Sequence, residues 1–290
     1  MRSDNFVLFA TPALIWGSTW FVITFQLGAV DPLISVVYRY LLAGVLLITY
    51  CLIRKVDLKF SVREHMFMAI QGFFLFGVNY WLVYESEQYI ASGLVAVAFS
   101  TMIFMNSGFG AIFLGSPINK KVILAALAGL SGTIIIFWNE LSQMDMTGDI
   151  LKGTMLAISS VVLASLGNIT SARNSRAKIP VLQANTFGML YGCALMTIVA
   201  LILGRPFTFD TSPSYILSLA YLSVFGSILA FGAYLTLVSK IGADKGAYAL
   251  VIIPVIAIVM SMIFEDYQLT LATIVGVVLI IGGNIIALRK

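Results

Sequence analysis

The sequence predicts an all-α integral membrane protein of ten transmembrane helices, arranged as two inverted five-helix repeats. Composition, the length of the apolar segments and an internal repeat lead to this prediction. Hydrophobic residues make up 60% of the chain and charged residues only 10%, and the mean hydropathy is +1.00. A water-soluble domain averages roughly 45–50% apolar and about 25% charged residues. Lipid must therefore contact most of the exterior.

The predicted helices are apolar segments long enough to cross the hydrocarbon core, which takes roughly 20 residues of α-helix. The strands of a membrane β-barrel would instead alternate in hydrophobicity over about ten residues, and the continuous apolar run at 41–48 does not alternate. The segments are residues 5–26, 32–53, 65–84, 90–114, 122–139, 151–172, 181–203, 214–238, 246–264 and 270–288.

The distribution of basic residues predicts the orientation of these helices. If the N-terminus is cytoplasmic, 14 of the 17 Lys and Arg residues fall in cytoplasmic connections or at the chain ends, and nine of the 13 acidic residues fall on the opposite side. Lys and Arg in short loops mark the cytoplasmic side. Both termini are therefore expected in the cytoplasm. The basic loops are read as topology signals that face lipid, and binding of nucleic acid is not expected.

The chain also repeats itself. Residues 14–18 of the first span align with residues 164–168 of the sixth, and Gly132 aligns with Gly282, both at an offset of 150 residues. Further matches in the second and fourth spans keep the same order. This predicts two units, residues 1–140 and 150–290, and because each has five spans, the second must enter the membrane inverted. Inverted repeats are typical of secondary transporters, whose substrate sits near the midplane.

The same segments resemble the drug/metabolite transporter superfamily, specifically the EamA-type ten-helix transporters. The resemblance covers essentially the whole chain, but it does not identify a substrate. Its carrying residues are 15–19 (Ile-Trp-Gly-Ser-Thr), 39–43 (Arg-Tyr-Leu-Leu-Ala), 89–96, Pro254, Glu265, Gly276, Gly282 and Gly283. It implies a central cavity lined by spans one, three, four, six, eight and nine. The family's usual proline in the fourth span is absent, since the chain reads Thr-Met-Ile at 101–103, and the usual Gly-Glu after that span is Gly-Ser at 115–116.

The spans contain little that could catalyse a reaction. His65 is the only histidine, and the chain has neither a His-Glu-x-x-His zinc motif nor a Gly-x-x-x-x-Gly-Lys nucleotide loop. Cys51 and Cys193 both fall inside spans and are read as packing residues. We therefore expect no enzyme activity, cofactor or metal site, and ATP hydrolysis is not expected to drive the protein.

Neutral polar and aromatic side chains within the spans are the candidates for a binding site. Polar groups in hydrocarbon should face the protein interior, where they either bond neighbouring helices together or bind a solute. For Asn79, beside Tyr80, and for Asn168, at the repeat position of Ser18, both interpretations stand. Trp81 and Tyr84 near the outer end of span three could belong to an interfacial belt. The predicted substrate-binding residues are Trp16, Asn79, Tyr80, Ser100, Asn168, Tyr234 and Tyr248.

Arg39 is the one charge deep inside a predicted span, seven residues after Pro32 and so roughly 10 Å along the helix. Such charges are costly and usually functional. It could reach outward to lipid headgroups, pair with an outer acid such as Glu85 or Glu87, or contact the substrate. We favour a gating or structural role, shared with Pro254 and Glu265. Glu85, Glu87 and Glu265 are otherwise expected to be solvated ends of loops.

The sequence thus predicts a multi-pass transporter of the inner membrane that exports amino acids or related amphipathic solutes by alternating access. Export and the substrate class come from the resemblance. The alternative is a non-transporting membrane subunit with the same fold, active in lipid handling or assembly. Facilitated diffusion, exchange and proton antiport stay open, and the protein is expected to be a monomer or homodimer.

Overall fold

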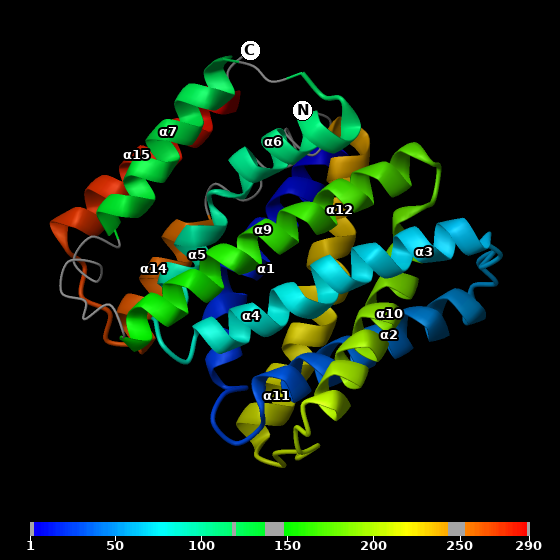
Figure 1. Ribbon diagram of the computed structural model, residues 1–290. Helices are drawn as coiled ribbons and strands as arrows, with labels where there is room; N and C mark the ends of the chain where they lie inside the picture. Colours follow the sequence, from blue (N-terminus) through cyan, green and yellow to red (C-terminus); the bar gives the residue numbers. More distant parts are fainter. Residues whose placement is uncertain (1–2, 118–119, 137–147, 243–252, 289–290) are drawn as a thin grey trace.

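The computed structural model describes residues 3–117, 120–136, 148–242 and 253–288, and within these ranges it consists of helices and short connections (Figure 1). The first half contains α1 (Ser3–Thr24), α2 (Pro32–Ile53), a third span made of α3 (Val62–Gln71), η1 (Gly72–Val78) and α4 (Asn79–Ser86), a fourth made of α5 (Ser92–Phe99) and α6 (Met102–Leu114), and α7 (Lys120–Ile136).

The second half follows the same order. It contains α9 (Asp149–Arg176), α10 (Val181–Ile202), a composite span of α11 (Pro213–Tyr221), η2 (Leu222–Leu229) and α12 (Ala230–Ile241), then α14 (Ile253–Phe264) and α15 (Leu271–Leu288). Seven of these spans are long and apolar enough to cross a membrane, and shorter apolar helices occupy the places predicted for spans five, nine and ten. The predicted fold class is confirmed.

Several helices begin where the sequence carries a capping signal. Asp31 accepts a hydrogen bond from Leu33 N at 2.9 Å, with Pro32 as the first residue of α2. Ser61 and Glu64 form a reciprocal capping box at the start of α3. These side chains satisfy backbone N–H groups that have no partner within the helix.

The two halves share backbone irregularities that lie about 150 residues apart. The π-helical stretches η1 and η2 begin at Gly72 and Leu222, inside spans three and eight. Positive φ angles recur at nearly the same offset, in the pairs Gly28 and Lys178, Lys55 and Gly204, and Gly115 and Asp266. The backbone therefore traces one path twice, as expected for a repeat.

Charged residues of opposite sign gather at opposite ends of the bundle. The acidic end carries Asp31, Glu85, Glu87, Asp210 and Glu265, and here Arg205 Nη1 forms an ion pair with Asp31 Oδ2 at 3.1 Å. The basic end carries Arg54, Lys59, Arg63, Arg176 and Lys178, and here Arg176 Nη1 donates to the Leu114 carbonyl at 2.8 Å.

Glycines allow two pairs of helices to approach closely. A Cβ atom on Gly72 would lie 2.1 Å from the carbonyl oxygen of Gly188, so the third span and α10 touch through backbone. Likewise, a Cβ atom on Gly132 would lie 2.6 Å from the Gly276 oxygen, where α7 and α15 lie side by side at one edge of the bundle (Figure 1). Small residues at such crossings are typical of membrane helices.

Candidate functional site

A cavity of about 50 Å³ lies between the two halves of the chain. Its walls come from spans one, three, four, six, eight and nine, the six spans that the family resemblance implied. The lining residues are Trp16, Thr19, Trp20, Ile23, Leu75, Asn79, Tyr80, Ala96, Phe99, Ser100, Met102, Ala164, Asn168, Phe231, Tyr234 and Ile253. None of them carries a formal charge.

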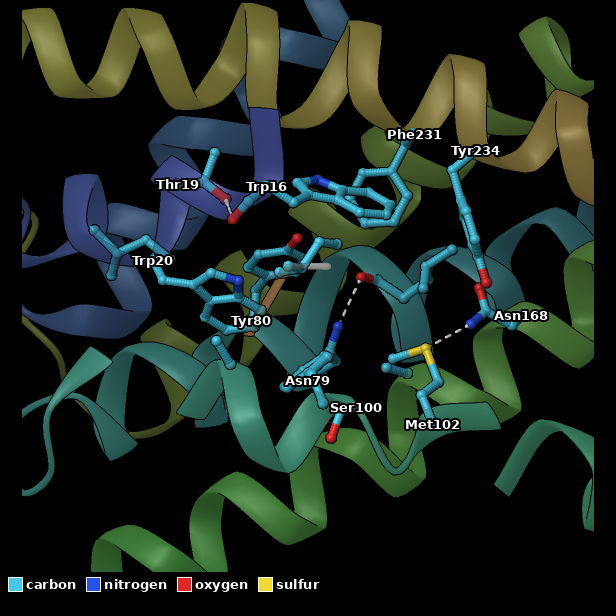
Figure 2. Close-up of a pocket in the computed structure, with 16 residues that line it drawn as sticks. Trp16, Thr19, Trp20, Asn79, Tyr80, Ser100, Met102, Asn168, Phe231 and Tyr234 are labelled. Atoms are coloured by element: carbon cyan, nitrogen blue, oxygen red, sulfur yellow. Dashed lines mark hydrogen bonds between the residues drawn. The ribbon is translucent and has the colours of Figure 1, made fainter. Parts of the chain in front are cut away.

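Aromatic rings form much of the wall (Figure 2), and Trp16 packs edge to face against two of them. The ring of Trp16 lies 4.8 Å from that of Phe231 and 5.3 Å from that of Tyr234, measured between centroids. The ring centroids of Trp20 and Phe99 lie 4.8 Å apart, with the rings tilted by 57°. A hydrogen bond holds the Trp16 indole in place, since its Nε1 donates to the Gly226 carbonyl at 3.0 Å. These contacts give a rigid apolar surface that could hold a solute by stacking.

Four polar atoms of the wall are buried without a hydrogen-bond partner among the described residues. They are the Oδ1 atoms of Asn79 and Asn168, the Nε1 of Trp20 and the hydroxyl of Tyr234. Both amides are anchored by their other atom, because Asn79 Nδ2 donates to the Leu75 carbonyl at 3.2 Å and Asn168 Nδ2 donates to Met102 Sδ at 3.0 Å. Figure 2 shows the hydroxyl end of Tyr234 directed toward the Asn168 amide. Buried polar groups are normally satisfied, so unpaired atoms around one cavity point to a ligand.

The fourth span is interrupted beside the cavity. Helix α5 ends at Phe99 and α6 begins at Met102, so Ser100 and Thr101 interrupt the α-helix, while Ser100 N still donates to the Val97 carbonyl at 3.0 Å. The Thr101 hydroxyl donates to the Ala98 carbonyl at 2.7 Å. The break therefore arises without the proline that the family usually has in this span.

The structure brings six of the seven predicted substrate-binding residues to this cavity. Trp16, Asn79, Tyr80, Ser100, Asn168 and Tyr234 all line it, and their role in binding remains a prediction. Tyr248 lies outside the described residues.

The wall also contains residues that were not predicted from the sequence, among them Trp20 and Phe231. A signal was present, because Trp20 lies four residues after Trp16 and Phe231 three residues before Tyr234, and such spacings share one face of a helix.

Arg39 lies behind the wall and is fully buried, which excludes an outward reach to headgroups. Its Cζ sits 4.4 Å from the centroid of the Tyr80 ring, its Nε donates to Ser227 Oγ at 2.9 Å and its Nη1 donates to the Tyr84 hydroxyl at 3.4 Å. The prediction that Arg39 pairs with Glu85 or Glu87 is also wrong. Within the described ranges, the structure shows an ion pair between Arg205 and Asp31 and none that involves Arg39. The guanidinium instead joins α2 to spans three and eight through hydroxyls and an aromatic face.

Pro254 and Glu265 lie on either end of α14. Pro254 is buried near the described start of this helix. Glu265 accepts hydrogen bonds from the Oγ of Ser92 at 2.6 Å and from the Oγ of Ser261. It is therefore held by the start of α5 and is not a freely solvated residue, contrary to the expectation for this loop end.

Comparison with known proteins agrees with this architecture. The profile of the EamA-like transporter family matches residues 6–138 and again residues 151–289. A protein of Escherichia coli strain K12 named "Uncharacterized inner membrane transporter YedA" is 29% identical over 86% of this chain and 78% of its own length. "Protein PagO" of Salmonella typhimurium is 23% identical over 97% of this chain and 92% of its own. A solved crystal structure of a protein shares the fold, with a TM-score of 0.74 over 99% of this chain and 98% of that chain at 19% identity. The chain is a multi-pass membrane protein that belongs to the EamA-like transporter family.

Proposed function

We propose that this protein is a secondary transporter of the inner membrane that exports a small amphipathic metabolite, an amino acid or a related solute, by alternating access. The observation that carries the proposal is the cavity between the two repeats, because its wall combines aromatic rings with unpaired polar atoms. An inverted repeat can open such a site to either side by rocking one unit against the other.

The chemistry of the wall supports a solute with an amino or ammonium group. The free Oδ1 atoms of Asn79 and Asn168 can each accept a hydrogen bond, whereas Trp20 Nε1 can only donate one. The aromatic ring of Trp16 could bind an apolar body or a cation. An amino acid offers all three features, since it has N–H donors, carboxylate acceptors and a side chain.

We do not propose an enzymatic activity for this protein. His65 lies at the basic end, where its Nδ1 is 2.9 Å from the hydroxyl of Tyr191, and it is not among the cavity-lining residues. The direction we propose, export, rests on the family resemblance. We place both termini in the cytoplasm because the basic end then faces inward.

Transport by purified protein in liposomes tests the proposal. Uptake of labelled amino acids and of the amphipathic cation tetraphenylphosphonium should exceed uptake by protein-free liposomes for at least one probe. The fluorescence of Trp16 and Trp20 should change with the same probe, because both indoles line the cavity. A variant with Trp16 and Trp20 replaced by Phe should lose that change, while Trp81 still reports a folded protein. If no probe moves and none alters the fluorescence, the protein is better explained as a non-transporting subunit.

A further inference from the structure

One carboxylate at the acidic end is buried without a hydrogen-bond partner. Glu87 follows the last residue of α4, and only 9% of its surface is exposed. Neither of its carboxylate oxygens has a partner among the described residues. Glu85, two residues earlier, contrasts with it, because it accepts from Trp81 Nε1 at 3.0 Å and from Gln88 Nε2 at 2.8 Å. The expectation that Glu87 is a solvated loop end is therefore wrong.

The charged groups around Glu87 favour its neutral form. From the end of α14, Glu265 repels a charge on Glu87, and from α2, Arg39 attracts it. On α9, Lys152 is engaged elsewhere, since its Nζ donates to the Tyr89 hydroxyl at 2.6 Å. Burial, followed by the charge of Glu265, raises the pKa of Glu87 well above its ordinary value, and Arg39 offsets only part of that rise.

Glu265 differs from Glu87 because its carboxylate has hydrogen-bond partners. It accepts hydrogen bonds from Ser92 Oγ at 2.6 Å, from Ser92 N at 3.4 Å and from Ser261 Oγ. The pair is therefore asymmetric, because the carboxylate of Glu265 is hydrogen-bonded and that of Glu87 is buried without a partner among the described residues.

Glu87 is connected to the cavity through one face of α4. Tyr80, Tyr84 and Glu87 are spaced by four and three residues, so they follow one another along the helix over roughly 10 Å. Tyr80 lines the cavity, and Arg39 contacts both tyrosines. Glu265 is linked to another wall of the cavity, because it bonds Ser92 at the start of the helix that carries the lining residues Ala96 and Phe99.

We propose that Glu87 is the proton-binding residue that couples transport to a proton gradient, with Glu265 and Arg39 setting its charge. The inference rests on the transport function proposed above. When the acidic end opens, water reaches the Glu87 carboxylate, which takes one proton to form the neutral acid. Closing that end buries Glu87 again, and this is favourable only for the neutral form, since burial of an unpaired charge is costly. The proton leaves through the cavity when it opens to the other side, in exchange for the exported solute.

Infrared difference spectroscopy of the purified full-length protein tests proton binding without any substrate. The wild type should show the carbonyl stretch of a protonated carboxylic acid at pH values well above about 4.3, where an ordinary Glu is ionised. Glu87→Gln should lose this band, and Glu85→Gln should keep it. Glu265→Gln should keep the band but lose it at a lower pH, because the repelling charge is gone. A band unchanged in Glu87→Gln, or no band in the wild type, would overturn the proposal.

Thermal unfolding in detergent gives a second measure of proton binding by Glu87. Because the folded state holds a proton that the unfolded state has released, stability should fall as the pH rises from the ordinary pKa of Glu toward the raised pKa of Glu87. Glu87→Gln should lose this slope and Glu85→Gln should retain it. Equal slopes in the wild type and Glu87→Gln would contradict the assignment.

A transport assay in liposomes distinguishes the proposal for Glu87 from the proposal that the protein is a transporter. With a solute that the panel identifies, an imposed proton gradient should drive wild-type uptake, and a trapped pH dye should report proton movement. Glu87→Gln should lose gradient-driven uptake but keep exchange of labelled for unlabelled solute. If gradient-driven uptake survives in Glu87→Gln, the proton site is wrong and transport stands. If no solute moves but the infrared band depends on Glu87, the proton site stands and the transport proposal fails.

Discussion

Polar side chains in this bundle fall into two groups, which only their hydrogen bonds distinguish. Gln71 is satisfied on both sides, since its Nε2 donates to Asn185 Oδ1 at 3.2 Å and its Oε1 accepts from Asn174 Nδ2 at 3.0 Å. Asn79, two turns further along the same span, keeps its Oδ1 unpaired at the cavity. The first amide joins helices and the second is available to a solute.

Replacing these two amides by Leu should give opposite results. Asn79→Leu should lower uptake in liposomes while thermal stability stays close to that of the wild type, because it removes an unpaired polar atom without opening a void. Gln71→Leu should cost about 1–3 kcal/mol of unfolding free energy, since it leaves Asn185 and Asn174 without their partner. Normal transport by both Asn79→Leu and Trp16→Ala would show that the cavity residues serve packing alone.

Replacing Arg39 tests the role of a charged side chain buried inside the bundle. Arg39→Ala should lower both transport and the yield of folded protein, because it removes the hydrogen bonds to Ser227 and Tyr84 and empties a fully buried site. Arg205→Ala is the matched control, since its ion pair with Asp31 is at the surface and worth at most about 1 kcal/mol. Normal yield of Arg39→Ala with a selective loss of affinity would favour direct substrate contact over the structural role.

At the scale of the helices, the sequence predicted the spans but not their interruptions. The length of the apolar segments was enough to predict all the spans that the structure describes, because a span is recognised from the hydropathy summed over about 20 residues. The break at Ser100 and Thr101 and the π-helical stretch η1 leave that sum unchanged. The burial of Glu87 was equally hidden, since its sequence neighbours Glu85, Ser86 and Gln88 are polar. It depends on the folded bundle, where Glu265, just beyond the end of α14, acts electrostatically on Glu87.

The glycine contact between the third span and α10 permits a sharp test. In Gly72→Ala, the new Cβ would lie 2.1 Å from the Gly188 oxygen and 2.8 Å from the Gly188 carbonyl carbon, and backbone cannot move aside as a side chain can. We expect a loss of about 1–3 kcal/mol or more of stability. Gly108→Ala, with no atom within 4 Å of its Cβ, should leave the melting temperature unchanged or raise it. Equal melting temperatures for the two variants would show that the helices do not meet this closely.

For the whole molecule, the separation of acidic and basic ends predicts the orientation in the membrane. Single cysteines placed at 54–63 should react with a membrane-impermeant reagent only from the cytoplasm, and those placed at 141–149 only from outside. The native Cys51 and Cys193 are buried and give a low background. Labelling of 141–149 from the cytoplasm would reverse the proposed topology and, with it, the side from which Glu87 would take its proton.

The paired π-helical stretches η1 and η2 also bear on the origin of the chain. A π-helical stretch amounts to one extra residue in an α-helix, and here it occurs in the corresponding span of each half, 150 residues apart. Two independent insertions at matching places would be a coincidence, whereas one insertion in an ancestral gene for a single half, followed by duplication, produces both. On that account the widened turn is older than the two-repeat protein. The ancestral five-helix unit then already carried this irregular turn when two copies of it assembled in opposite orientations.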